Sequence, residues 1–209
     1  MKEVAAILLA AGTSSRMGFP KQLLEWHHQP LLQYQIDRIC RLSVKEVVVV
    51  LGHKSELIQE NVQSDCSKVT YLTCKTYKEG LSESLKYGLS YTRRKYSGVL
   101  IMLADLPLIR LQTLEGVVDK GSKLLVKEKF PFSIQPQYKQ KVGHPVFIGN
   151  FHSLEWDQLE GDKGAKLLLK QLKMKEFIET DDPGIIFDID TEEAYRQALE
   201  FDRKLFLKR

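Results

Sequence analysis

An apolar segment near the start of the chain ends abruptly in small residues, and this junction constrains the fold more than any other feature. Residues 4–9 (VAAILL) are apolar throughout and are followed by AAGTSS. A short, unbroken apolar run is typical of a strand that is buried on both faces, as in a parallel sheet. The small residues after it leave backbone N–H groups open to a ligand. We therefore expect a first buried strand that leads into a binding loop.

Strand-like and helix-like segments alternate along the rest of the chain. Apolar runs predict further strands at residues 47–51, 69–72, 99–103, 132–135 and 146–148. Helical spacing of apolar residues predicts helices at residues 30–42, 55–62, 81–96, 111–120, 164–172 and 192–206. This alternation favours an α/β fold in layers. Since no repeat, low-complexity linker or hinge divides the sequence, we expect residues 1–209 to form a single domain.

The composition of the chain argues against a nucleic-acid partner and against a membrane span. Lys and Arg outnumber Asp and Glu by only 31 to 27, so we expect no nucleic-acid partner, and the basic YTRRKY at residues 91–96 is expected to be a solvated helix end. No apolar run approaches the ~20 residues that a membrane span needs. The N-terminal apolar run imitates a secretory signal, but Glu3 interrupts its positive region. We expect a cytoplasmic protein.

The cysteines support the same expectation. Cys40, Cys66 and Cys74 form an odd set without a CxxC pair. This pattern predicts buried or tolerated thiols in a reducing compartment and disfavours a zinc site.

The loop after the first strand has the chemistry of an anion site. Arg16 offers two N–H groups to a phosphate and Lys21 offers a point charge. Backbone amides and two hydroxyls come from Ala10, Ala11, Gly12, Thr13 and Ser14. Neither the Walker A pattern nor GxGxxG is present. A tight strand–helix turn without a ligand is the alternative that these residues leave open.

The complete string LAAGTSSRMGFPKQLL (residues 9–24) resembles the signature LAAGxSxRMGxxKxLL of a nucleotidyltransferase superfamily. This superfamily includes the molybdenum cofactor guanylyl- and cytidylyltransferases. The resemblance implies that Arg16 and Lys21 neutralise the phosphates of a nucleoside triphosphate during catalysis. It implies nucleotide contacts from Leu9, Ala10, Ala11 and Gly12. The two alanines after Leu9, and the absence of an aspartate before Lys21, resemble the cytidylyl branch, a MocA-like family.

Two acidic motifs predict a metal site. Asp105, in LIMLADLPLI, follows a predicted buried strand, where a carboxylate suits Mg²⁺; a turn or helix-capping aspartate is the alternative. The resemblance to ADxP or GDxP favours the metal. FDIDTEEAY (residues 187–195) resembles DIDTPEDY, and Asp190 is our second Mg²⁺ ligand. Since Asp188 and Asp190 alternate along an extended segment, we expect them to point to opposite faces, so that only one faces the metal.

Three further segments resemble substrate-binding parts of the family. EGLSESLKYGL (residues 79–89) resembles the segment beneath the base and ribose, and predicts contacts from Gly80, Ser82 and Ser84; helix capping by the serines is the alternative. QYKQKVGHPVFIG (residues 137–149) resembles the GHPV segment and predicts that His144 binds the pterin. LEGDKGAKLLL (residues 159–169) resembles GDxGAR, with Lys166 in place of the arginine.

Together these resemblances imply a Rossmann-like, mostly parallel sheet and a nucleotidyltransferase. The implied reaction transfers CMP from CTP to molybdopterin-bound molybdenum, with Mg²⁺, and releases pyrophosphate. An apo molybdenum hydroxylase would be a further partner. One alternative is a nucleotidyltransferase acting on a sugar phosphate or an isoprenoid precursor. The other is a non-catalytic carrier that delivers the molybdenum cofactor.

Overall fold

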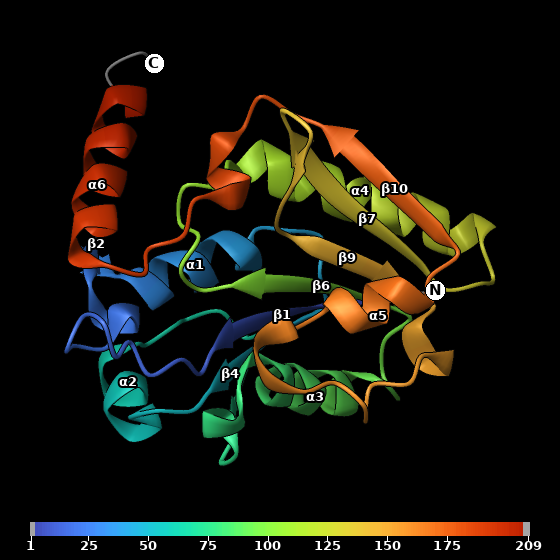
Figure 1. Ribbon diagram of the computed structural model, residues 1–209, viewed down its shortest axis with the longest axis horizontal. Coiled ribbons are helices and arrows are strands. Elements are labelled where there is room, and N and C mark those ends of the chain that lie inside the picture. Colours follow the sequence, from blue (N-terminus) through green and yellow to red (C-terminus); the bar gives the residue numbers. More distant parts are fainter. Residues whose placement is uncertain (1–2, 207–209) are drawn as a thin grey trace.

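The computed structural model describes residues 3–206, and its centre is an eight-stranded mixed sheet (Figure 1). Its main strands are β1 (Val4–Ala10), β4 (Glu46–Leu51), β5 (Val69–Thr73), β6 (Gly98–Leu103), β7 (Phe132–Tyr138), β9 (Val146–Gly149) and β10 (Met174–Glu179). They lie in the order β10-β7-β9-β6-β1-β4-β5. Along this path only β9 runs antiparallel to its neighbours. The predicted fold class, a mixed and mostly parallel sheet, is confirmed.

Short strands complete the framework. The two-residue strand β8 (Lys141–Val142) pairs antiparallel with β7. A separate small hairpin consists of β2 (Glu25–Trp26) and β3 (Gln29–Pro30). Short 3₁₀ helices lie at Lys21–Leu23, Tyr77–Glu79, Phe151–Ser153, Gly161–Lys163 and Pro183–Ile186.

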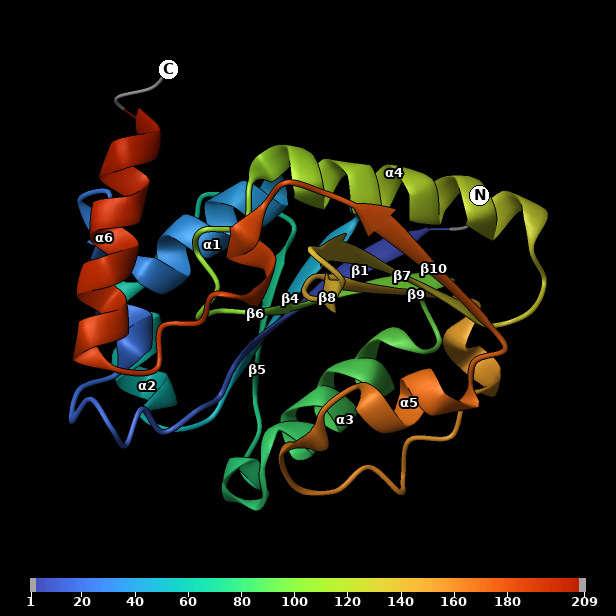
Figure 2. The same cartoon turned by 45° about the horizontal axis from the view of Figure 1, so that its top comes forward.

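Helices cover both faces of the sheet, as predicted (Figure 2). On one face lie α1 (Leu31–Cys40) and α4 (Leu111–Lys127), with α2 (Ser55–Asn61) contributing Ile58 to the same core. On the other lie α3 (Leu81–Thr92) and α5 (Lys166–Gln171). Successive residues of β1 alternate between the two cores, with Leu8 in the first and Leu9 in the second. This double burial is why β1 is apolar at every position.

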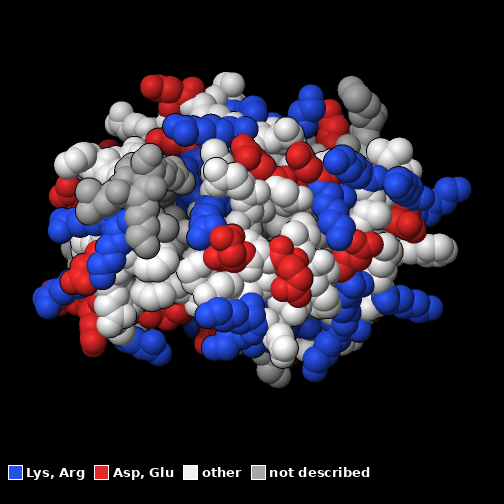
Figure 3. Space-filling model, turned by 90° about the horizontal axis from the view of Figure 1, so that it is seen from above, with Lys and Arg blue, Asp and Glu red and all other residues white. Residues whose placement is uncertain are grey.

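The last helix, α6 (Glu192–Phe206), stands at one end of the molecule beside α1 (Figure 1). Its Ala198 packs with Trp26 of the small hairpin. Within residues 3–206, no helix is long and apolar enough to cross a membrane. Seen from above, basic and acidic side chains are interspersed rather than gathered by sign (Figure 3).

The strand order places two loops at the same crevice. β1 lies between β4 and β6, and all three run parallel. After β1 the chain adds β4 and β5 on one side of that strand, and it later adds β6 on the other side. Ligands of open α/β sheets bind at such a reversal, outside the carboxyl ends of the strands. The loop after β1 and Asp105 after β6 both begin at this edge.

The cysteines depart from the sequence-based expectation. Cys40, at the end of α1, is bonded to Cys66, with their Cα atoms 6.6 Å apart. Only Cys74 is a buried free thiol, as expected. The pairing arises because the loop before β5 passes the end of α1, a proximity that sequence spacing did not reveal. Cysteine usage therefore no longer supports a reducing compartment.

Two glycines in helix interiors give opposite stability predictions. A Cβ on Gly88 of α3 would lie 2.7 Å from Cγ2 of Ile7, whereas one on Gly116 of α4 would meet nothing within 4 Å. We expect Gly88→Ala to lower the free energy of unfolding by about 1–3 kcal/mol through overpacking. We expect Gly116→Ala to raise it by about 0.5–1 kcal/mol through helix propensity. Urea unfolding of both variants is the measurement, and effects of equal sign would contradict the packing of α3 on β1.

Candidate functional site

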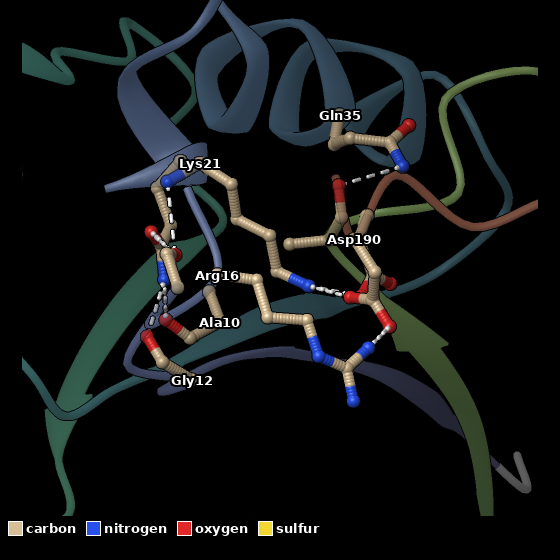
Figure 4. Close-up of polar contacts among 10 residues, drawn as sticks. Ala10, Gly12, Arg16, Lys21, Gln35 and Asp190 are labelled. Carbon is tan, nitrogen blue, oxygen red and sulfur yellow. Dashed lines mark hydrogen bonds and ion pairs between the residues drawn. The ribbon is translucent and has the colours of Figure 1, made fainter. Parts of the chain in front are cut away.

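The Lys21 ammonium lies between two carboxylates at the carboxyl edge of the sheet (Figure 4). Its Nζ is 2.5 Å from Oδ2 of Asp105 and 2.8 Å from Oδ1 of Asp190. The Arg16 guanidinium is 3.7 Å from the other oxygen of Asp190. The side chains of Lys21 and Asp105 are only 15% and 16% exposed, whereas Arg16 is 73% exposed. The structure thus brings together four predicted site residues from three distant segments.

Mutual attraction fixes the charges of this cluster. Burial alone would lower the pKa of Lys21, but the negative charge of Asp105 and hydrogen bonds to Asp105 and Asp190 outweigh it, so the pKa is raised. The hydrogen bond from Lys21 in turn lowers the pKa of Asp190, despite its partial burial. Lys21 is therefore a cation and Asp190 an anion at neutral pH.

Asp188 lies near the charged cluster. Burial first, and then the negative charges of Asp190 and Asp105, raise the pKa of its carboxyl group. Residues 187–190 are not part of a strand. The expectation that Asp188 and Asp190 point to opposite faces stays a prediction.

The loop after β1 is held from one side by a buried glutamine that sequence reasoning missed. Nε2 of Gln22 donates to the carbonyl oxygens of Ala10 at 2.6 Å and Gly12 at 3.2 Å (Figure 4). Further along, Oγ of Ser14 accepts from the Lys21 N–H at 3.0 Å. The signal that was overlooked is a polar side chain beside Lys21 in an otherwise apolar stretch, KQLL.

A cavity of about 360 Å³ opens between this loop and α3. Eight predicted site residues line it: Leu9, Ala10, Ala11, Gly12, Lys21, Gly80, Ser84 and Asp105. A smaller cavity of about 230 Å³ shares Gly12 and Lys21 with it and extends to Arg16 and Asp190. Lys21 thus lines both cavities.

The larger cavity is also lined by polar residues that sequence reasoning did not name as site residues, among them Tyr77, Lys78 and Asp162, the last within the predicted segment 159–169. Tyr77 packs against Gly52, where an added Cβ would come within 2.6 Å of its Cβ, and its hydroxyl lies 3.2 Å from Nδ1 of His53. Asp162 accepts a hydrogen bond from the N–H of Leu81 at the start of α3. None of the three belongs to the apolar patterns that reveal strands and helices.

The glycines and serines of the predicted site divide into two kinds. A Cβ on Gly12 would meet nothing within 4 Å, so the fold leaves open space there. Gly80 has φ of +113°, and a Cβ on it would lie 2.5 Å from the carbonyl carbon of Gly161, so the close approach it permits is to the chain itself. Ser82 is fully buried and donates to the carbonyl of Glu160 at 3.1 Å. Ser82 is thus bonded to the loop at Glu160, whereas Ser84 lines the cavity.

His144 is half-buried and lies outside the lining of both cavities as far as the structure describes them. Its backbone N–H donates to the carbonyl of Ile185 at 2.9 Å, and its peptide bond to Pro145 is cis. Burial lowers the pKa of the imidazole, with a partial offset from the charge of Asp105. The ring is therefore neutral, and Nδ1 is buried without a hydrogen-bond partner. Lys166, by contrast, is exposed at the start of α5.

The carboxylates suit a hard divalent cation that takes some of its ligands from the protein and the others from a substrate. Oδ1 of Asp105 is buried and has no hydrogen-bond partner, so one side of this carboxylate is available. Among residues 3–206, no group of three or more His, Cys, Asp or Glu side chains is arranged to hold a metal ion. Mg²⁺ is commonly held by only one or two carboxylates, with the remaining positions filled by phosphate oxygens and water. Asp105 and Asp190 fit that mode.

Comparisons with known proteins agree with this geometry. Residues 6–176 match the family of MobA-like NTP transferase domains. The bifunctional protein GlmU of Anaeromyxobacter dehalogenans is 32% identical over 123 residues, which are 57% of this chain and 25% of that protein. The chain spans about a quarter of the length of the curated relatives that it matches.

Solved structures share the fold over nearly the whole chain. The Rv0371c protein of Mycobacterium tuberculosis is 25% identical, with a TM-score of 0.75 over 95% of this chain and 98% of that one. The same protein has been solved in complex with manganese. CMP:2-keto-3-deoxy-manno-octonic acid synthetase, solved with CTP, is 14% identical, with a TM-score of 0.65 over 99% of both chains. At that identity the likeness concerns the fold alone.

The open space at Gly12 yields a direct test of the cavity. We expect Gly12→Val to change the free energy of unfolding by no more than about 0.5 kcal/mol, since an added Cβ would meet no atom within 4 Å. The same side chain would fill the cavity, so CTP binding, measured by calorimetry with Mg²⁺ present, should weaken at least about tenfold. Gly12→Ala serves as the smaller control, with an intermediate effect. Unchanged CTP affinity in a folded Gly12→Val protein would show that the cavity is not the binding site.

Proposed function

Because this chain belongs to the family of MobA-like NTP transferase domains, we propose that it is an Mg²⁺-dependent nucleotidyltransferase whose residues 1–209 act as one catalytic domain. The observation that carries the proposal is the Lys21 ammonium, which bridges Asp105 and Asp190 at the mouth of a cavity. A cation held by two carboxylates beside an amide-lined loop suits a ligand that brings both phosphates and a metal ion.

The nucleoside triphosphate would occupy the two cavities that Gly12 and Lys21 both line. The small residues Ala10, Ala11 and Gly12 allow the phosphates to approach the backbone. Arg16, exposed and only loosely paired, can turn its guanidinium toward the outer phosphates. Tyr77, with its ring packed at Gly52, offers an aromatic face near the cavity for the base.

Asp105 and Asp190 would hold the Mg²⁺ ion. The unpartnered oxygen of Asp105 supports its assignment as the first ligand, and the 42% exposed carboxylate of Asp190 supports its assignment as the second. When bound, Mg²⁺ supplies positive charge that stabilises the phosphate oxygens as the bond to the leaving group breaks.

The proposed chemistry asks the protein for positioning and charge. An oxygen of the acceptor's phosphate forms a bond to the α-phosphorus, while the bond from that phosphorus to the bridging β-phosphate oxygen breaks and pyrophosphate leaves. The attacking phosphate is already an anion, so no side chain needs to remove a proton. Lys21 and Arg16 would offset the charge that accumulates on the α-phosphate and the leaving group.

For the substrates, we propose CTP and the molybdenum cofactor, so that CMP is transferred to molybdopterin for the maturation of molybdenum hydroxylases. Support for CTP comes from the LAAG string, in which Ala10 and Ala11 line the cavity. Support for the pterin comes from the resemblance around GHPV; the half-buried His144 would contact the acceptor outside the two cavities.

One alternative acceptor is a sugar phosphate or an isoprenoid precursor. This alternative rests on the fold alone, which is shared at 14% identity with CMP:2-keto-3-deoxy-manno-octonic acid synthetase and with 4-diphosphocytidyl-2C-methyl-D-erythritol synthase of Anaerococcus prevotii. A non-catalytic carrier of the molybdenum cofactor is a less economical alternative, because it would not require the Lys21, Asp105 and Asp190 cluster.

The metal assignment is tested by Asp105→Asn. The variant keeps the size of the side chain but removes a charge, so we expect pyrophosphate release to fall by about 10²-fold or more, with a higher Mg²⁺ requirement. The matched control is Asp181→Asn, whose carboxylate is 89% exposed and paired with Arg110 away from the cavity. Thermal melting checks that both variants fold. Full turnover with an unaltered Mg²⁺ dependence in Asp105→Asn would remove this residue from the metal site.

The substrates are tested by competition. Wild-type protein is incubated with all four nucleoside triphosphates and either molybdenum cofactor, a sugar phosphate or an isoprenoid phosphate, and the products are identified by mass spectrometry. We expect a cytidylylated molybdenum cofactor and pyrophosphate. A guanylylated cofactor would correct the nucleotide, and a cytidylylated sugar or isoprenoid would correct the acceptor. Cofactor binding without pyrophosphate release would favour the carrier.

A further inference from the structure

Gln22 is a buried polar residue whose contacts all concern the loop after β1. Its side chain is 1% exposed. Its Nε2 reaches the carbonyl oxygens of Ala10 and Gly12, and its Oε1 lies 3.5 Å from Oγ of Ser14. A buried amide satisfied by the backbone of one loop restricts how that backbone can turn.

Because a peptide group is planar, the hydrogen bonds from Gln22 also determine where the neighbouring backbone N–H groups point. In a trans peptide the carbonyl and the following N–H point to opposite sides, and among residues 3–206 only the His144–Pro145 bond is cis. The carbonyls of Ala10 and Gly12 point at Gln22, so the N–H groups of Ala11 and Thr13 must point away from it. Both of these residues line the larger cavity.

The peptide group that joins Ala11 to Gly12 is held by a residue other than Gln22. The carbonyl of Ala11 accepts a hydrogen bond from the N–H of His53 at 3.3 Å. Three consecutive peptide planes are thus fixed by groups outside the loop. Ser14 then adopts a φ of +53°, a left-handed turn of the kind that makes backbone amides converge on an anion.

We propose that Gln22 is a positioning residue that aims the N–H groups of Ala11 and Thr13 at the phosphates of the nucleotide. This inference rests on the proposed function and adds to it a residue that acts through the backbone of the loop, although Gln22 itself also lines the larger cavity. Without the two bonds from Gln22, the carbonyls of Ala10 and Gly12 are free to rotate. A carbonyl oxygen turned into the cavity would repel the phosphate that the N–H group attracts.

Gln33 provides a matched control for the loss of a buried glutamine. It is 8% exposed, and its Nε2 donates to Oδ1 of Asp37 at 2.7 Å, within α1 and away from the loop. Gln22→Met and Gln33→Met remove the same donor group with little change in volume. Gln22→Glu is a second variant, isosteric with glutamine but unable to donate in its ionised form.

The experiment measures binding of CTP and of inorganic tripolyphosphate by calorimetry. We expect Gln22→Met to weaken both by about 10- to 100-fold, as expected for misdirecting two hydrogen bonds to a charged group. Gln22→Glu should weaken both at least as much. Gln33→Met should leave both affinities within about twofold of wild type, even where its melting temperature falls as far. In turnover, the KM for CTP should rise in Gln22→Met with kcat changed much less.

The outcomes separate the positioning role from the proposed function. Wild-type protein that binds neither CTP nor tripolyphosphate would overturn the proposed function and this inference with it. Wild-type binding with equal affinity in Gln22→Met would overturn the positioning role alone. Should Gln22→Met not fold, NMR of the wild type decides. Large tripolyphosphate-induced shifts of the Ala11 and Thr13 amide protons support the inference, and their absence overturns it.

Discussion

The contact between the Lys21 ammonium and the carboxylates of Asp105 and Asp190 holds the carboxyl edge of the sheet together. Lys21 follows the loop after β1, Asp105 follows β6, and Asp190 precedes α6. Because the Lys21 and Asp105 side chains are mostly buried, their attraction is weakly screened by solvent and raises the pKa of Lys21. The same contact draws the chain before α6 back over the sheet, where the N–H of Ile189 donates to the carbonyl of Asp105.

This cluster can form only because of the strand order. β1 and β6 are adjacent and parallel, so the residues after both strands emerge at the same edge. Small residues then keep the space beside them open, since a Cβ on Gly12 would meet no atom within 4 Å. Gln22, which is buried and also lines the larger cavity, holds that open loop through hydrogen bonds to the carbonyl oxygens of Ala10 and Gly12. The site thus combines a rigid buried layer with an accessible backbone.

Sequence patterns predicted the central strands because strands buried on both faces are apolar at nearly every position, as in β1 and β4. The helices were predicted from the spacing of their apolar residues. These patterns missed β10, an edge strand whose alternating exposure in MKEFIE gives a weak signal. Arg16, Lys21, Asp105 and Asp190 were assigned through motifs, and the structure brings them together. The partners of Ser82 and Gln22, and the pairing of Cys40 with Cys66, depend on contacts between segments far apart in sequence or on loop geometry. The spacing of apolar residues along the sequence does not reveal such contacts.

The charges at this edge also explain why a nucleoside triphosphate would need a metal ion here. Lys21 is already matched by Asp105 and Asp190, one cation against two anions. Phosphates added beside them increase the negative charge in a partly buried site, where repulsion is strong. Arg16 can respond with little loss, because it is 73% exposed and 3.7 Å from Asp190. Lys78 also lines the larger cavity and adds positive charge there. A divalent cation at the unpartnered oxygen of Asp105 would offset part of the remaining negative charge.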